Sequence, residues 1–176
     1  MLSQINFQLF FRAVIIFLVS SMQALILPYL SFGQAIGNII LVVLVIFIFR
    51  KEYLKAFYWA LIAGVILDLS LGVGFGPYLV SYLLIFSIVY FWQEKILSEN
   101  IYLFAIITVF IASIIFDIVF IVTAKWIGQN LSLSIFWTLI LKQAAYNTIL
   151  LAIVYPIYYY FEKRLFSHSE IKLPTA

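Results

Sequence analysis

Three ionisable side chains, Asp68, Asp117 and Lys142, lie inside long apolar stretches of the sequence. Near the centre of a bilayer each would cost about 3 kcal/mol or more unless it is paired. Counted at about 1.5 Å of helix per residue, all three lie in the half of their segments that is nearer the same membrane face. The sequence therefore predicts a buried cluster of two carboxylates and one amine inside a helix bundle, with Gln143 and Asn147 adding hydrogen bonds.

Three roles are compatible with such a cluster. It can be structural, because buried polar groups fix the register and orientation of packed helices. It can contact a partner helix or a lipid head group. It can also line an ion or substrate pathway, which is the usual role of charges within transporter helices.

The sequence contains no other residues in a pattern typical of catalysis or metal binding. The single histidine, His168, lies in a polar tail without a second ligand nearby, and the chain has no cysteine, so neither a zinc nor a thiolate site is expected. The serines in the apolar stretches have no histidine base and no G-x-S-x-G turn. A salt-bridged Asp68 and Asp117 would make a poor shared-proton pair. We expect no catalytic, metal or cofactor site and no enzymatic activity.

Small residues recur next to one of these charges. Gly64, Asp68, Gly72 and Gly76 are spaced four apart, and the first three would lie along one stripe of a helix. Small residues at this spacing let a second helix approach closely in a membrane. Close packing within the chain followed by a turn explains this stripe, and no phosphate-binding loop is implied because the following lysine is absent.

The elements that carry these residues are strongly apolar. Of 176 residues, 66% are hydrophobic and 10% are charged, and the mean hydropathy of +1.19 is typical of a membrane protein. Since a spanning helix needs about 20 apolar residues, we expect an all-α integral membrane protein with six transmembrane helices in residues 1–165 and a polar cytoplasmic tail in residues 166–176. The apolar runs are 7–27, 35–49, 54–71, 77–92, 101–124 and 134–160.

The run 35–49 is shorter than a full span. It predicts a tilted or partly re-entrant segment, or a locally thinned bilayer. Five spans are the alternative to six.

Lysine and arginine set the expected orientation, because short loops rich in them stay in the cytoplasm. With the amino terminus inside, Lys125 falls in an outside loop, and the other basic residues fall at cytoplasmic ends or loops: Arg12, Arg50, Lys51, Lys55, Lys95, Lys163, Arg164 and Lys172. A five-span chain would place either Arg12 or the pair at positions 163 and 164 on the wrong side. We therefore expect both termini in the cytoplasm.

Two stretches of the sequence carry a family resemblance. The first contains Gly64, Asp68, Gly72 and Gly76 and continues through residues 78–83. It resembles the signature of the MreD family, the rod-shape-determining membrane proteins of bacteria.

The second stretch, residues 145–156, resembles the final helix of that family. It has the pair Tyr146 and Asn147, then Pro156, and then a basic end. Length, hydropathy and span number match over nearly the whole chain. One departure is Gly74, because the family often has a proline between the two glycines after the aspartate.

The resemblance implies a non-enzymatic scaffold of the cell-elongation machinery in the bacterial cell membrane, without a cofactor. As a family member the chain would bind the single-span protein MreC and help regulate peptidoglycan synthesis and rod shape. Its further partners would be RodA, a class B penicillin-binding transpeptidase and, indirectly, MreB filaments. The positions that the resemblance singles out are Gly64, Asp68, Gly72, Gly76, Tyr146, Asn147 and Pro156, either for partner contact or for the fold alone.

A second class of protein is similar in size and span number: the substrate-binding membrane subunit of an energy-coupling-factor transporter. That family places small alanines four apart on its first helix to dock the energising subunit. Here that helix has only Ala13 and Ala24, which disfavours the transporter. An intramembrane hydrolase, the third class, would need a catalytic pair that the sequence does not show.

Overall fold

The computed structural model describes residues 2–31, 34–72, 74–95, 101–129 and 133–166. Its regular structure over these residues is helical, which confirms the predicted all-α class. The order is α1 (Leu2–Leu25), the 3-10 helix η1 (Leu27–Leu30), α2 (Ile39–Phe49), α3 (Tyr53–Leu71), α4 (Pro77–Lys95), α5 (Ile101–Trp126) and α6 (Leu133–Phe166).

Each predicted apolar run corresponds to one α-helix, but the helix boundaries differ from the predicted ones. The run 35–49 becomes helical only at Ile39, and the residues of the run before it are not helical. The 34 residues of α6 extend beyond the predicted run at both ends. The predicted tail lies outside the described residues, except for Phe166, which ends α6.

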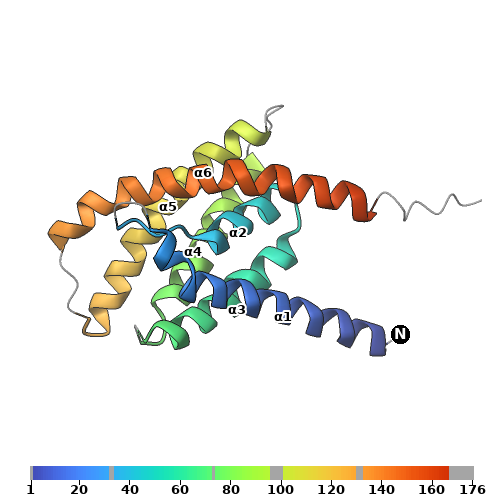
Figure 1. Ribbon diagram of the computed structural model, residues 1–176, viewed down its shortest axis with the longest axis horizontal. Helices are drawn as coiled ribbons and strands as arrows, with labels where there is room; N and C mark the ends of the chain where they lie inside the picture. The colour runs from blue at the N-terminus through green and yellow to red at the C-terminus, as the bar shows by residue number, and fades with distance from the viewer. Residues whose placement is uncertain (1, 32–33, 73, 96–100, 130–132, 167–176) are drawn as a thin grey trace, which may run out of the picture.

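The short helix α2 forms the centre of the bundle. It packs against α1, α3, α4, α5 and α6, which surround it in Figure 1. Nine of its 11 residues are buried, and none of them is polar. A helix that is apolar on every face is stable only when it is covered on every face, so its composition explains its central position.

The two ends of the bundle carry different connections. At the end shown on the right of Figure 1 lie the amino end of α1, the turn between α2 and α3, and the carboxyl end of α6. At the opposite end, here called the η1 end, lie η1, the turn between α3 and α4, and the carboxyl end of α5. Both termini of the helical part therefore lie at the same end.

Three described helical segments are long and apolar enough to cross a membrane: Tyr53–Leu71, Tyr102–Trp126 and Trp137–Tyr160. Shorter apolar helical segments cover Ala13–Leu25, Ile39–Phe49 and Pro77–Gln93. Large apolar side chains also face outward, among them Phe17, Phe91, Val122, Leu141 and Ile153. An outer surface of this kind is typical of a helix bundle that is solvated by lipid.

Candidate functional site

Asp68 holds the start of α4. One carboxylate oxygen, Oδ2, accepts hydrogen bonds from the backbone N–H groups of Gly76 at 2.9 Å and Leu79 at 3.2 Å, and Oδ1 accepts one from Tyr78 at 2.8 Å. Because α4 begins at Pro77, these groups have no acceptor within the helix. The carboxylate also lies at the positive end of the helix dipole. Backbone donors therefore compensate a charge that is only 2% exposed.

The glycines around Asp68 have separate structural reasons. Gly72 ends α3 in the left-handed region with φ 63°, and Gly76 has φ 128°, so both adopt conformations that favour glycine. Gly64 lets α3 approach α4 closely, because a Cβ there would lie 2.6 Å from Cα of Leu79. These residues thus belong to one tightly packed helical hairpin of α3 and α4.

Side chains from three parts of the chain satisfy the first N–H groups of α2. Asn38 caps the helix, its Oδ1 accepting from Leu41 N at 3.0 Å. Oδ1 of Asn147 accepts from Asn38 N at 2.6 Å, and Oε1 of Gln23 accepts from Ile40 N at 3.0 Å. Non-helical backbone inside a membrane is tolerated where protein groups satisfy it in this way.

These amides belong to a larger buried network. The hydroxyl of Tyr82 donates to Oδ1 of Asn38 at 2.8 Å, and Nε2 of Gln23 donates to both at 3.2 Å. Nδ2 of Asn147 donates to Oγ of Ser113 at 3.0 Å. The network joins α1, α4, α5 and α6 to the start of α2, and each of its members is buried.

Tyr146 adds a contact between α6 and the segment before α2. Its hydroxyl donates to the carbonyl oxygen of Leu30 at 3.1 Å. A Cβ at Gly37 would lie 2.5 Å from Leu150 Cδ1 and 3.0 Å from Tyr146 Cε1. Tyr146 therefore contacts η1 and Gly37, and Asn147 holds Asn38, so both residues fix the chain between α1 and α2.

A cavity of about 560 Å³ opens beside this network at the η1 end. Its size falls within the range of about 300–1,000 Å³ that is usual for ligand sites. Its lining combines amide side chains, aromatic rings and one carboxylate: Gln23, Ala24, Pro28, Gln34, Ile36, Gly37, Asn38, Leu71, Tyr78, Phe116, Asp117, Phe120, Leu139 and Gln143.

Asp117 is the charged residue of this lining. It is 5% exposed, and its Oδ2 atom has no hydrogen-bond partner among the described residues. Burying a carboxylate without compensating hydrogen bonds is costly. Asp117 therefore differs from Asp68, whose two oxygens are both satisfied.

The predicted cluster of Asp68, Asp117 and Lys142 does not form. Asp68 is satisfied by backbone groups, and Lys142 is exposed on the outer face of α6. The physical reason is helix geometry: consecutive residues are about 100° apart around the axis, and Gln143 is the residue that turns toward the cavity. The sequence positions of the three charges predicted a common depth in the membrane. They did not predict which side of each helix the charges lie on.

Pro156 lies inside α6 with an exposed ring. It removes one backbone donor from the helix interior, and it contributes to neither the network nor the cavity lining. Its role in partner contact stays a prediction.

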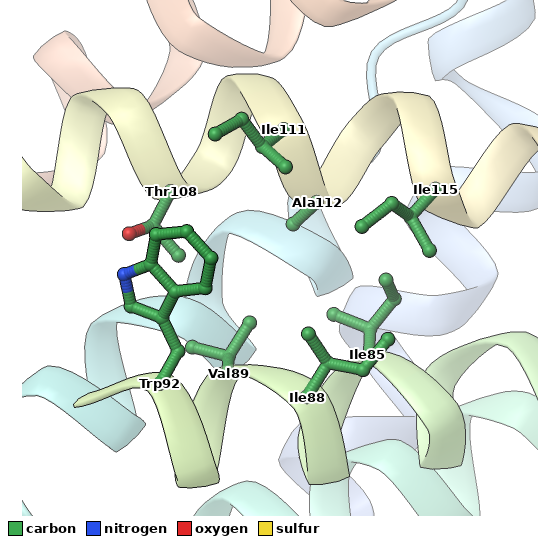
Figure 2. A pocket seen from close by; sticks show the side chains of 8 residues that line it. All are labelled: Ile85, Ile88, Val89, Trp92, Thr108, Ile111, Ala112 and Ile115. Atoms are coloured by element: carbon green, nitrogen blue, oxygen red, sulfur yellow. The ribbon is translucent and has the colours of Figure 1, made fainter. Parts of the chain in front are cut away.

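A second hollow lies between α4 and α5 (Figure 2). It measures about 20 Å³ and is lined almost wholly by apolar side chains, with Trp92 and Thr108 at one end. This volume is about that of one water molecule, so the hollow is a packing defect and not a ligand site. No group of three or more metal-ligating side chains occurs in the described part of the chain.

Four members of the polar network were not predicted from the sequence: Gln23, Asn38, Tyr82 and Ser113. One signal was present: Asn38 directly precedes the apolar run of α2, and asparagine at that position is typical of a helix cap. Gln23 was also a polar residue inside a predicted span. The pairing of the two side chains has no local signature.

Comparisons with protein-family models, with curated proteins and with solved structures each found no match to this chain.

Proposed function

We propose that this chain is a non-enzymatic membrane scaffold of the MreD type, located in the bacterial cell membrane. In this role it binds the single-span protein MreC and helps regulate peptidoglycan synthesis and rod shape. RodA, a class B penicillin-binding transpeptidase and, indirectly, MreB filaments are its further partners.

The proposal rests on one observation: the residues that resemble the MreD family help stabilise the same helix bundle. Gly64, Asp68 and Gly76 build one helical hairpin, and Asn147 holds the start of the central helix. Residues matched on two distant stretches of sequence thus stabilise one bundle. A scaffold that acts through helix faces needs such a tightly packed bundle, and this shared structural use is what supports the proposal.

The proposal includes a topology of six crossings with both termini in the cytoplasm. The 11 residues of α2 rise about 16 Å, so the second crossing is completed by the non-helical segment before it. The common end of α1 and α6 (Figure 1) supports an even number of crossings. The exposed Lys51 also lies at that end, as expected for a cytoplasmic loop.

Co-purification tests the scaffold role. The tagged full chain is extracted from bacterial membranes in a mild detergent, with an unrelated multi-pass protein carrying the same tag as control. We expect a single-span protein with a large external domain, identified as MreC by mass spectrometry, with this chain and not with the control. Recovery of an ATPase pair in its place would contradict the proposal.

The cavity favours a second candidate, the substrate-binding subunit of an energy-coupling-factor transporter. A space of about 560 Å³ with amide and aromatic walls suits a small molecule better than a protein partner. Neighbouring coding sequences discriminate the two candidates: genes for ATPase subunits favour the transporter, and cell-wall genes favour the scaffold.

A further inference from the structure

The buried carboxylate of Asp117 has no partner that explains it. It lines the cavity at the η1 end, and only 5% of the residue is exposed. Its Oδ2 has no hydrogen-bond partner among the described residues. A buried polar group without a partner is uncommon, because it loses its hydration and gains nothing in return. A ligand in the cavity is one way to satisfy it.

Among the described residues, no lysine or arginine forms a hydrogen bond to Oδ2 of this carboxylate. The described cavity lining contains no lysine or arginine, and the nearest candidate in the sequence of α6, Lys142, is exposed. Residues 32–33, 73 and 130–132, which connect the helices, include no basic residue type. A cationic ligand in the cavity would supply the positive charge that the described lining lacks.

Aromatic rings border the same space. Tyr78 lies with its ring centroid 4.7 Å from that of Phe120 and 6.2 Å from that of Phe116, and all three line the cavity. Phe116 directly precedes Asp117 in α5. The face of an aromatic ring attracts cations, and a carboxylate beside it strengthens the attraction.

Amide groups complete the polar side of the cavity. Gln143 and Gln34 join Gln23 and Asn38 in the lining. The last two are engaged in the network around α2, whereas no hydrogen bond ties Gln143 or Gln34 to another described residue. Both can therefore donate to or accept from a ligand.

We propose that this cavity binds a small organic cation, with its ammonium group against Asp117 and its apolar body against the rings of Tyr78, Phe116 and Phe120. The site goes beyond the scaffold role and would supply a substrate class for the transporter candidate. It does not depend on partner binding, since co-purification and ligand binding are separate measurements and either can fail alone.

The experiment compares ligands that share an indole ring and differ in charge. The full chain in lipid nanodiscs is titrated calorimetrically with tryptamine, which is cationic at neutral pH, with neutral 3-ethylindole and with anionic indole-3-propionate. Benzylamine serves as a second cation, and empty nanodiscs correct for partition into lipid. The variants are Asp117→Asn and, as a matched change of carboxylate to amide at the other end of the bundle, Glu52→Gln.

We expect tryptamine to bind at least about tenfold more tightly than 3-ethylindole, and indole-3-propionate not to bind. Asp117→Asn should remove this preference and leave 3-ethylindole unchanged, while Glu52→Gln should retain it. If Asp117→Asn does not fold, the charge series on the unaltered chain decides alone.

Three results would overturn the proposal. The first is equal affinity for tryptamine and 3-ethylindole, and the second is no saturable binding of tryptamine or benzylamine. The third is a folded Asp117→Asn variant that keeps the preference for tryptamine.

Discussion

Replacing Asp68 with asparagine removes one of the two carboxylate oxygens that hold the start of α4. In the structure Oδ2 serves the N–H groups of Gly76 and Leu79, and Oδ1 serves that of Tyr78. Asparagine in the same position keeps one oxygen and presents an amide N–H₂ group to the remaining backbone donor. The change is almost isosteric, so it tests the hydrogen bonds and the charge, not the packing.

The magnitude follows from these contacts. One hydrogen bond to a charged group contributes about 1.5–3 kcal/mol, and the two retained bonds lose their charge assistance. A further contribution of about 0.3–1 kcal/mol comes from the helix dipole. We expect Asp68→Asn to lower the free energy of unfolding by about 3 kcal/mol, and Asp68→Ala to lower it by more because all three donors are left unsatisfied.

The assay is equilibrium unfolding of the purified protein in mixed micelles, followed by the fluorescence of its four tryptophans, of which Trp59 is buried. Asp117→Asn is the matched control, because that carboxylate has an unpaired oxygen and its replacement removes a buried charge. It should leave stability unchanged or raise it by up to about 2 kcal/mol. Equal losses at Asp68 and Asp117, or no loss at Asp68, would refute this explanation of the two sites.

Three further substitutions test the packing of the bundle and its network. Gly64→Ala should destabilise by about 1–3 kcal/mol, since its Cβ would meet the backbone of Leu79 at 2.6 Å. Asn147→Ala should cost about 1–3 kcal/mol, because it leaves the N–H group of Asn38 unsatisfied in a buried site. Tyr82→Phe should cost about 1 kcal/mol, because it removes one hydroxyl from the network. The unfolding assay described above measures all three.

Neighbouring residues provide the controls for these substitutions. Ser70→Ala on the exposed face of α3 matches Gly64→Ala, and Thr148→Ala matches Asn147→Ala because its hydroxyl bonds only within α6. Tyr102→Phe, with an exposed ring, matches Tyr82→Phe. Each control should change stability by no more than about 0.5 kcal/mol. A control that costs as much as its partner would show that the assay reports general helix effects.

The all-α class and the approximate helix positions could be predicted because long apolar runs have few alternatives in a membrane. The central position of α2 was not predicted, because the short run 35–49 indicated only a tilted or re-entrant segment, or a locally thinned bilayer. Its uniformly apolar sequence defines a helix that is covered on all sides, but the coverage depends on residues far away in the sequence. Asn147 lies 109 positions from Asn38, and no local pattern encodes that pairing.

The charged residues show more clearly what could not be predicted from the sequence. The sequence predicted Lys142 as a partner of Asp68, but its partners are backbone groups at the start of the following helix. The presence of a charge in a span indicates that it needs a partner, while the direction of each side chain depends on the rotation of its helix in the bundle. A rotation of one residue separates the exposed Lys142 from Gln143 in the cavity lining.

The topology is tested most directly by cysteine labelling, since the chain has no native cysteine. Single cysteines replace the exposed residues Ser31 and Gln129 at the η1 end and Lys51 at the opposite end, and a membrane-impermeant maleimide is added to intact cells. We expect labelling at positions 31 and 129 in intact cells, and at position 51 only after the membrane is permeabilised. Labelling of positions 31 and 51 from the same side would contradict it.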